Sequence, residues 1–344
     1  MCKIAKMVKV AIVGASGYTG AELMRICASH PSFEVVVATA RSHEDQRVAD
    51  VYPSLSKAYG EMRYKATELD LLADLDVVFL ALPHGESHRI AGSLLGSAGV
   101  IVDLSADFRL LDPRMYPLWY GWEHQSPDLL EEAVYGLPEL FRTEVVDARL
   151  IAVPGCYPTA AGLALAPFMR SGAIEGTAVI VDALSGLSGA GRSLQESTQF
   201  CAVTGGASAY GIGEHRHAPE MEQLIGASVL FAPHLAPMAR GILATCYAPS
   251  SGGLSTEDAL GLLRDAYAGE PFIVVNERLP ETKAVMGSNC AHLSARVDVK
   301  TGWLVVICAL DNLVKGASGQ AVQCANLTTG CPEDEGLAAA GVYP

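Results

Sequence analysis

The sequence predicts an α/β protein of two domains, in which a doubly wound parallel sheet comes first and an α+β domain with a mixed sheet follows. Three observations predict this fold. Glycines near the N-terminus are spaced as a tight turn between an apolar run and a helical pattern. Short β-branched runs then alternate with helical patterns, which is typical of parallel strands joined by right-handed crossovers. Beyond residue 153 the strand-like runs are longer and separated by turns, as expected of a mixed or antiparallel sheet.

The composition indicates a folded enzyme and excludes several other classes. The chain has 344 residues, enough for two domains of ordinary size, and half of it is hydrophobic. Its net charge of −14 argues against a nucleic-acid or anionic-membrane surface, because Lys and Arg supply most binding to phosphate backbones. Nine cysteines at irregular spacing indicate reduced thiols in a cytoplasmic protein rather than a disulfide or zinc framework. We expect no signal peptide and no membrane span, because every apolar run is too short.

Residues 1–152 are predicted to form a Rossmann-type nucleotide-binding domain. A strand over residues 8–13, the glycine turn, a helix over 21–29 and a returning strand at 33–42 make one βαβ unit. Two further buried strands are expected, at 76–83 and 99–105.

Residues 153–311 are predicted to form the second domain. After Asp311 the chain has a loop and then an Ala- and Gln-rich helix, which we expect to pack back on the first domain. Residues 312–344 would thereby complete the Rossmann domain, and the tail from residue 328 to 344 is expected to be irregular.

The glycine turn, GASGYTG, is a variant of the dinucleotide-binding fingerprint with glycines at Gly14, Gly17 and Gly20. Glycine permits the tight turn and the close approach of a diphosphate, while the N-terminus of the following helix offers free N–H groups to the anion. The turn lies between a predicted strand and a predicted helix, with a second strand at the right distance. This context favours a dinucleotide site over a purely structural turn.

The end of the second predicted strand indicates which dinucleotide binds. An NAD site usually carries Asp or Glu there for the ribose hydroxyls, whereas an NADP site offers a cation. This chain has Ala40, Arg41 and Ser42. We therefore expect NADP, with Arg41 and Ser42 among the cofactor-binding residues; the alternative is that Arg41 is a solvated surface residue.

One cysteine has a setting that suggests chemistry. Cys156 follows Pro154 and Gly155, which fix a turn, and precedes a helix expected over residues 159–167. The positive end of a helix dipole and nearby backbone N–H groups favour thiolate over thiol, and the same amides can hold an oxyanion. The alternative is a buried structural cysteine.

Covalent thiol chemistry needs an acid or base nearby, and the segment EHRHAPE can supply one. It places His215 and His217 around Arg216, flanked by Glu214 and Glu220. A metal pair or a solvated charged loop are the alternatives, and we expect no metal because the sequence has no second ligand cluster.

Three more segments follow predicted strands. ALPHGESH contains His84 and His88 without the zinc pattern HExxH, and is expected to be a loop. DLSADFRLLD places Arg109 after a strand end, where an arginine fork suits phosphate or carboxylate. LSGLSGAGRS is a flexible loop that could bring its backbone close to a ligand.

These segments occur together in a known family. The sequence resembles N-acetyl-γ-glutamyl-phosphate reductase, an NADP-dependent enzyme family of arginine biosynthesis, and more distantly the aspartate-semialdehyde dehydrogenases. The resemblance covers nearly the whole chain. It rests on GASGYTGAEL, ALPHGES, DLSADFRL, YGLPEL, PGCYPTA, LSGLSGAGR, EHRHAPE and DNLVKGASGQAVQ, of which PGCYPT with HRHAPE is specific to the reductases.

The resemblance implies the roles of several residues. Cys156 would be the nucleophile, His217 the acid and base, and Arg109 would face the phosphate-bearing end of the substrate. Arg216 is a further candidate for substrate contact. The implied cofactor-binding residues are Gly14, Ser16, Gly17, Tyr18 and Thr19 at the diphosphate, and Ser188 and Asn312 near the nicotinamide. The family often reads Thr-Ser-Arg where this chain has Thr39-Ala40-Arg41, which removes one hydroxyl contact to the 2′-phosphate.

The family's reaction is the NADPH-dependent conversion of an acyl phosphate to a semialdehyde and phosphate through a cysteine thioester. The same chemistry on a carrier-bound aminoadipyl phosphate of lysine biosynthesis is one alternative, and a nonenzymatic NADP-sensing protein is another. Aspartyl phosphate is disfavoured by the PGCYPT and HRHAPE contexts. The resemblance also implies a homo-oligomer, a dimer or tetramer, and makes residues 153–311 the catalytic and oligomerisation domain. From the charge and the short apolar runs we expect no nucleic-acid or membrane partner.

The NADP assignment makes a first prediction. Replacing Arg41 by Asp should weaken the binding of NADPH far more than the binding of NADH. The substitution removes the cation that would bind the 2′-phosphate and adds a carboxylate that suits the ribose hydroxyls. Fluorescence titration with both nucleotides measures the two dissociation constants, and equal effects on both would refute the assignment.

Overall fold

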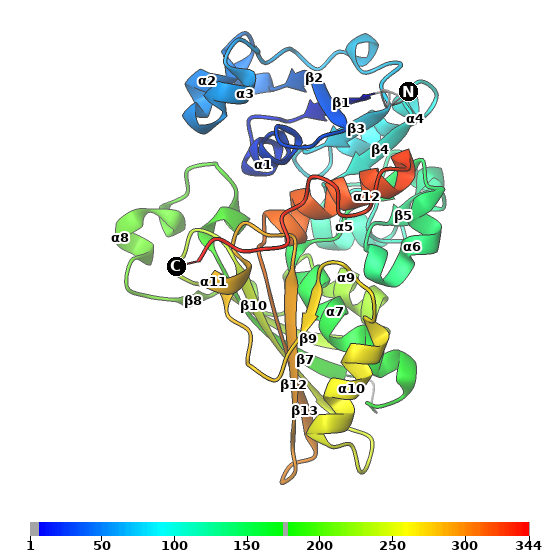
Figure 1. Ribbon diagram of the computed structural model, residues 1–344, viewed down its shortest axis with the longest axis vertical. Coiled ribbons are helices and arrows are strands. Elements are labelled where there is room, and N and C mark those ends of the chain that lie inside the picture. The colour runs from blue at the N-terminus through cyan, green and yellow to red at the C-terminus, as the bar shows by residue number, and fades with distance from the viewer. Residues whose placement is uncertain (1–6, 175–177, 344) are drawn as a thin grey trace, which may run out of the picture. The chain divides into compact units, whose positions relative to one another are not determined.

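The computed structural model describes residues 7–174 and 178–343. Residues 1–6, which include Cys2 and the start of the N-terminal segment in which no signal peptide is expected, lie outside this part, and so does Thr177. The chain divides into two compact units (Figure 1). Unit 1 comprises Met1–Pro154 and Ala317–Leu337, and unit 2 comprises Gly155–Gly316 and Ala338–Pro344. In the prediction all of residues 312–344 joined the first domain, whereas here 312–316 and 338–344 go with the second.

Unit 1 is built on a parallel six-stranded sheet, which confirms the predicted doubly wound fold. Its strand order is β2-β1-β3-β4-β6-β5, and every neighbouring pair is parallel. The residues of β3 and β4 are all buried, as expected of central strands covered on both faces. The strands are β1 Val8–Val13, β2 Phe33–Thr39, β3 Val77–Leu80, β4 Val100–Asp103, β5 Val134–Tyr135 and β6 Leu150–Ala152.

The first helix of unit 1 begins at Tyr18, three residues before the predicted start. Gly17 caps it with an extended backbone, φ −75° and ψ 167°, so the helix starts directly after the turn. The helices of this unit are α1 Tyr18–Cys27, α2 Val48–Val51, α3 Ser56–Tyr59, α4 Ala91–Leu95, α5 Met115–Tyr120, α6 Pro138–Val146 and α12 Gly319–Thr329.

The C-terminal helix α12 is part of unit 1 although some 160 residues of unit 2 precede it. The Ser318 hydroxyl donates to the carbonyl oxygen of Thr19 (2.9 Å), and the Gln320 amide donates to that of Gly136 (2.7 Å). Both side chains are fully buried. These bonds satisfy buried polar groups at both contacts and hold α12 in place.

Unit 2 is built on a seven-stranded mixed sheet of order β11-β12-β13-β10-β7-β9-β8. The pairs β7/β9 and β11/β12 are parallel and the other neighbours are antiparallel. This confirms the mixed sheet predicted from the longer strand-like runs. The strands are β7 Ala178–Ser185, β8 Ser208–Ala209, β9 Ser228–Leu235, β10 Ile242–Pro249, β11 Ile273–Val275, β12 Ala291–Asp298 and β13 Trp303–Leu310.

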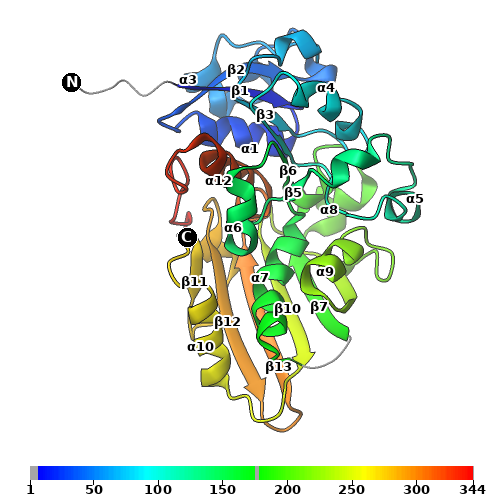
Figure 2. The same ribbon diagram turned by 90° about the vertical axis from the view of Figure 1, so that its right-hand side faces the viewer.

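Helices cover one face of this sheet (Figure 2), where α7, α9 and α10 pack on the strands. Short helices follow in the connecting segments. The α-helices are α7 Cys156–Ser171, α8 Phe200–Val203, α9 Ala218–Ile225, α10 Thr256–Ala266 and α11 Thr282–Val285, and a short π-helix runs over Val314–Ser318. Among the described residues, none of the helices is long and apolar enough to span a membrane.

The opposite face of the mixed sheet is apolar but only partly covered. Along β7, β10 and β13 the side chains alternate between buried and partly exposed. The buried set faces the helices, and the partly exposed set consists mostly of large apolar residues. This second set includes Ile180, Leu184, Leu243, Tyr247, Trp303, Val305 and Ile307.

Helix α7 contains two prolines and tolerates both. Pro158 lies in the first turn, where a backbone N–H would have no intrahelical partner. Pro167 lies in the interior, so the carbonyl oxygen of Leu163 loses the N–H that would ordinarily reach it from four residues on. The hydroxyl of the buried Tyr267 donates to that oxygen instead, at 2.7 Å. A tertiary hydrogen bond thus replaces one of the helix's own.

This replacement predicts the effect of a conservative change. Tyr267→Phe should lower the free energy of unfolding by about 1–3 kcal/mol, because it removes the donor from a buried carbonyl. Urea unfolding measures the loss. The matched control is the same change in a Pro167→Ala background, where the restored N–H can reach Leu163. An equal loss in both backgrounds would show that the hydrogen bond to Leu163 is not the cause.

Candidate active site

The glycine turn of unit 1 has the geometry that a dinucleotide needs. Gly14 has a φ of +84°, and a Cβ added there would lie 2.3 Å from the carbonyl oxygen of Ala81. A Cβ at Gly20 would lie 2.4 Å from the oxygen of Gly14. Both positions therefore require glycine. No side chain caps α1, so its first-turn N–H groups can hold a diphosphate.

The other predicted residues of the turn surround the start of α1. The Tyr52 hydroxyl donates to the carbonyl oxygen of Ser16 (2.8 Å), and Ser318 donates to that of Thr19 (2.9 Å). Tyr18 is the first residue of the helix and is 38% exposed. These contacts fix the backbone of the turn from both sides.

Arg41 and Ser42 follow the end of β2 after one residue, Ala40, and lie in a short 3₁₀ helix, Arg41–His43. Both side chains are exposed. In the sheet β1 lies between β2 and β3, so the strands are added on one side of β1 and then on the other. In sheets of this kind the end of the second strand lies where the ribose of a dinucleotide binds. An exposed cation at this position fits a 2′-phosphate.

Arg109, predicted at the substrate phosphate, is buried in unit 1. Its guanidinium donates to the carbonyl oxygens of Val153 (2.7 Å) and Leu104 (2.9 Å). It therefore joins the ends of two neighbouring strands, β4 and β6. The sequence did not indicate this structural role.

In unit 2, Cys156 is the first residue of the sixteen-residue helix α7 and is partly exposed. The helix thus begins three residues before the predicted start, because Pro158 is compatible with its first turn. Gly316 packs against the cysteine, and a Cβ there would lie 2.7 Å from the Cβ of Cys156. The thiol therefore occupies a helix N-terminus, where the dipole and the free N–H groups favour a thiolate.

His217 lies against the residue before the cysteine. A Cβ at Gly155 would lie 2.6 Å from His217 Nε2 and 2.7 Å from its Cε1. His217 also caps the start of α9. The structure therefore brings the predicted nucleophile and the predicted acid and base to the adjoining ends of two helices.

Glu220 holds these two helix ends together. Its carboxylate is fully buried and accepts a hydrogen bond from the Gly155 N–H at 2.9 Å. It stands three residues after His217, in the first turn of α9. The sequence showed Glu220 only as a flanking charge; its spacing from His217 on a helix is the signal that could have revealed its role.

His215 plays a different part from His217. Burial and, less strongly, the charge of Arg216 lower the pKa of His215 to about 4. Its Nδ1 accepts a hydrogen bond from the His217 N–H (3.1 Å), so His215 is neutral and orients the backbone of its neighbour. Its ring meets Tyr157, Tyr210 and Phe231 edge to face. Arg216 between the two histidines is exposed.

Ser188 and Asn312, both predicted near the nicotinamide, are hydrogen-bonded to each other. The Asn312 amide donates to the Ser188 hydroxyl at 2.9 Å, and its oxygen accepts from the Gly241 N–H at 2.7 Å. Asp311 beside it is fully buried and accepts from the Gly287 N–H (2.7 Å) and from Arg240 (3.3 Å). The predicted pair is thus held rigidly within unit 2.

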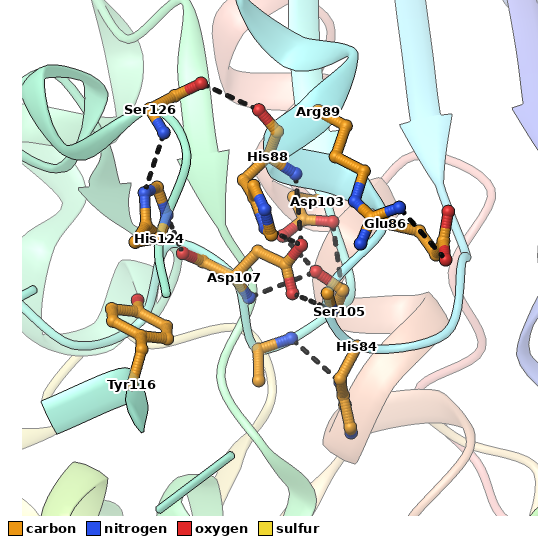
Figure 3. Close-up of polar contacts among 12 residues, drawn as sticks. His84, Glu86, His88, Arg89, Asp103, Ser105, Asp107, Tyr116, His124 and Ser126 are labelled. Atoms are coloured by element: carbon orange, nitrogen blue, oxygen red, sulfur yellow. Dashed lines mark hydrogen bonds and ion pairs between the residues drawn. The ribbon is translucent and has the colours of Figure 1, made fainter. Parts of the chain in front are cut away.

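A buried polar network lies at the carboxyl ends of β3 and β4 (Figure 3). Asp107 accepts three hydrogen bonds, from the Gly85 N–H, the His88 N–H and His88 Nδ1. Ser105 donates to Asp103 through both its N–H and its hydroxyl. Burial, and then the negative charge of Asp107, raises the pKa of Asp103 well above its usual range. Sequence reasoning missed this network.

The network includes a second histidine. Nε2 of His124 donates to the carbonyl oxygen of Asp107 (2.7 Å), and Nδ1 accepts from the Ser126 N–H (3.2 Å). The His88 ring stacks on Trp122 and lies beside His124. Among the described residues, no group of three or more potential ligands is arranged to hold a metal ion.

Comparison with known proteins identifies the family. The model of the semialdehyde dehydrogenase NAD binding domain matches residues 9–148, and that of the dimerisation domain matches residues 156–312. Proteins named N-acetyl-γ-glutamyl-phosphate reductase are 48% identical in Symbiobacterium thermophilum and 46% identical in Heliobacterium modesticaldum. The alignments cover 98% of this chain and 99% and 100% of those relatives. The chain belongs to the N-acetyl-γ-glutamyl-phosphate reductase family. The predicted family is therefore confirmed.

Solved structures of more distant proteins share the fold. Aspartate semialdehyde dehydrogenase II of Vibrio cholerae, solved with ASA, has a TM-score of 0.71 at 14% identity, over 94% of this chain and 99% of that one. The Candida albicans enzyme, solved with NADP, has a TM-score of 0.68 at 15% identity, with the same coverage. The reductase family and the aspartate-semialdehyde dehydrogenases thus have one architecture.

The contact between Gly155 and His217 makes a prediction. Gly155→Ala should reduce turnover by about a hundredfold or more, because the new methyl group would displace the imidazole by an ångström or so. The φ of Gly155, −65°, is compatible with alanine, so the fold should persist. Steady-state kinetics and thermal melting measure the two effects. Gly96→Ala is the matched control, since a Cβ there meets nothing within 4 Å. Wild-type turnover in Gly155→Ala would contradict the expectation.

Proposed function

We propose that this protein catalyses the NADPH-dependent reductive dephosphorylation of N-acetyl-γ-glutamyl phosphate to N-acetylglutamate 5-semialdehyde, in arginine biosynthesis. One observation carries the proposal. Cys156 stands at the N-terminus of α7, and His217 lies against the preceding residue at the start of α9. A thiol and an imidazole in this arrangement suit acyl transfer through a covalent intermediate. The names of the relatives supply the substrate.

In the first half of the reaction, the Cys156 thiolate attacks the carbonyl carbon of the acyl phosphate. The free N–H groups of the first turn of α7 stabilise the negative oxygen of the tetrahedral intermediate. The carbon–oxygen bond to phosphate then breaks, inorganic phosphate leaves, and a thioester of Cys156 remains. A thioester, unlike a carboxylate, readily accepts hydride, so the thiol holds the acyl group on the protein in a form that can be reduced.

In the second half, the thioester carbonyl is reduced, and NADPH, when bound, would supply the hydride for this. His217 donates a proton to the oxygen of the resulting thiohemiacetal. It recovers that proton when the carbon–sulfur bond breaks, which releases the aldehyde and regenerates the thiolate. His215 stays neutral throughout and keeps the backbone of His217 in place.

Cofactor choice follows from unit 1. The exposed Arg41 supports NADP over NAD, and no carboxylate stands among Thr39, Ala40, Arg41 and Ser42 to bind the free ribose hydroxyls. Gly14, Ser16, Gly17, Tyr18 and Thr19 would hold the diphosphate, and Ser188 and Asn312 the nicotinamide.

For the substrate, Arg216 and Arg109 are our candidates. The exposed Arg216 stands between the two histidines and would bind a carboxylate or phosphate of the substrate. Arg109 would bind the phosphate-bearing end of the substrate. Its hydrogen bonds to the carbonyl oxygens of Leu104 and Val153 would keep its guanidinium in one position.

The proposed assembly is a homo-oligomer, a dimer or tetramer, in the cytoplasm. The partly covered apolar face of the mixed sheet, with Leu184, Leu243 and Val305, suits burial against a second copy. The matched dimerisation-domain model covers the same strands. The eight described cysteines are all free thiols, which fits a reducing compartment.

A reverse assay tests the reaction. Purified protein is mixed with NADP⁺, phosphate and N-acetylglutamate semialdehyde, and NADPH absorbance is followed. We expect phosphate-dependent NADPH formation with this aldehyde. Aspartate and aminoadipate semialdehydes are tested in parallel. Activity with one of these two aldehydes, and none with N-acetylglutamate semialdehyde, would assign the enzyme to another pathway. If the protein is folded and binds NADPH but forms no NADPH with any of the three aldehydes, the proposal is refuted.

Two variants test the assigned roles. Cys156→Ser should abolish turnover while leaving NADPH binding intact, because the hydroxyl is a far weaker nucleophile than a thiolate. His217→Asn should reduce kcat by about 10²–10⁴-fold and flatten one limb of its pH profile. Substantial turnover in Cys156→Ser would rule out the covalent mechanism. An unchanged pH profile in His217→Asn would rule out proton transfer by His217.

A further inference from the structure

A second segment of the chain lies beside the end of β2, where the ribose of a dinucleotide binds in sheets of this kind. Lys65 forms a parallel bridge with Thr39, the last residue of β2. The Lys65 N–H donates to the carbonyl oxygen of Ala38 (3.0 Å), and the Ala40 N–H donates to that of Lys65 (3.1 Å). These two hydrogen bonds fix the backbone of Lys65 beside the residues that lead into Arg41.

The residue before Lys65 holds the same segment from its other edge. Tyr64 is fully buried, and its N–H donates to the carbonyl oxygen of Gln46 at 3.0 Å. Its carbonyl oxygen accepts from the Asp45 N–H at 2.9 Å. The side chain of Lys65, by contrast, is exposed. The main chain at Lys65 is therefore fixed on both sides, while its side chain extends into solvent.

This register brings Lys65 within reach of the anion that Arg41 would bind. Ala40 is extended, with φ −156° and ψ 117°, so the chain keeps the rise of a strand as far as Arg41. Paired strands lie about 4.8 Å apart and rise about 3.3 Å per residue, which places the Cα atoms of Lys65 and Arg41 about 8 Å apart. Both side chains are long and exposed, so their cationic ends can meet at one phosphate.

The charges of these two residues favour an anion between them. Among the described residues, neither Arg41 nor Lys65 forms an ion pair with a carboxylate, although the whole chain has a net charge of −14. A neighbouring cation differs, because the Arg47 guanidinium binds both carboxylate oxygens of Asp50, at 3.0 and 2.8 Å. Two cations held near each other repel, and a phosphate that binds both removes this repulsion.

We propose that Lys65 is a cofactor-binding residue, whose ammonium binds the 2′-phosphate of NADPH together with the Arg41 guanidinium. Lys65 thereby contributes to the preference for NADPH over NADH, because the two nucleotides differ only in this phosphate. The inference rests on the nucleotide site proposed at Arg41 and does not depend on the proposed reaction. Sequence reasoning missed Lys65, since it lies outside the glycine turn and the second predicted strand.

Titration with the two nucleotides tests the role of Lys65. Lys65→Met removes the charge and keeps an unbranched side chain of similar length. We expect it to weaken the binding of NADPH about tenfold, the loss of one contact to a charged group, and to leave the binding of NADH within about twofold of wild type. Lys65→Arg keeps the cation and should bind NADPH within about threefold of wild type. Fluorescence titration without substrate measures each dissociation constant.

The matched control is Lys57→Met, which removes the same charge from an exposed lysine of α3 in the same unit. It should leave the dissociation constants of both nucleotides within about twofold of wild type. Thermal melting checks that each variant is folded, as expected for substitutions of exposed side chains.

The ratio of the NADH to the NADPH dissociation constant decides the outcome. A fall of about fivefold or more in Lys65→Met, absent from Lys65→Arg and Lys57→Met, supports the proposal. A smaller fall, or an equal fall in either of the other two variants, overturns it. If Arg41→Asp lowers the ratio and Lys65→Met does not, Arg41 alone binds the phosphate. The measurement needs no turnover, so the proposed reaction could fail while this result stands, or the reverse.

Discussion

The hydrogen bond from the Gly155 N–H to the buried Glu220 carboxylate joins the starts of α7 and α9, and the candidate active site depends on it. Cys156 is the first residue of one helix and His217 caps the other. Separating the two helix ends would leave the buried carboxylate without this donor, at a free-energy cost of several kcal/mol. The hydrogen bond therefore holds the two ends together strongly. Glu220 also faces the positive end of α9, which stabilises its charge.

In unit 1 a buried carboxylate also joins two segments of the chain. Two loops follow neighbouring parallel strands, and the Asp107 carboxylate of one accepts three donors from the other. In both units a side chain from one segment binds backbone N–H groups of another, and so fixes a main-chain position as well as a side chain. Loops held in this way can present reactive or binding groups without rearrangement, which is what pre-organised sites require.

Local signals in the sequence predicted much of this structure. The glycine turn could be predicted because Gly14 must adopt a positive φ, and the buried strand β3 because its residues are apolar throughout. Cys156 was predicted at a helix start, although Pro158 suggested a later one. The contacts of Glu220 with Gly155, Asp107 with Gly85 and Tyr267 with Leu163 were not predicted. They join residues 65, 22 and 104 positions apart, and no local pattern records such pairs.

The chain builds unit 1 from two separate stretches, and this order matters during synthesis. The sheet of unit 1 is encoded before residue 153, but α12 and the side chains of Ser318 and Gln320 that bind Thr19 and Gly136 come more than 160 residues later. On the ribosome, where domains fold as they emerge, the N-terminal domain gains these contacts only after unit 2 has been synthesised. The mixed sheet, complete at Leu310, can form before it. The domain that is synthesised first is therefore the one whose last helix is made at the end.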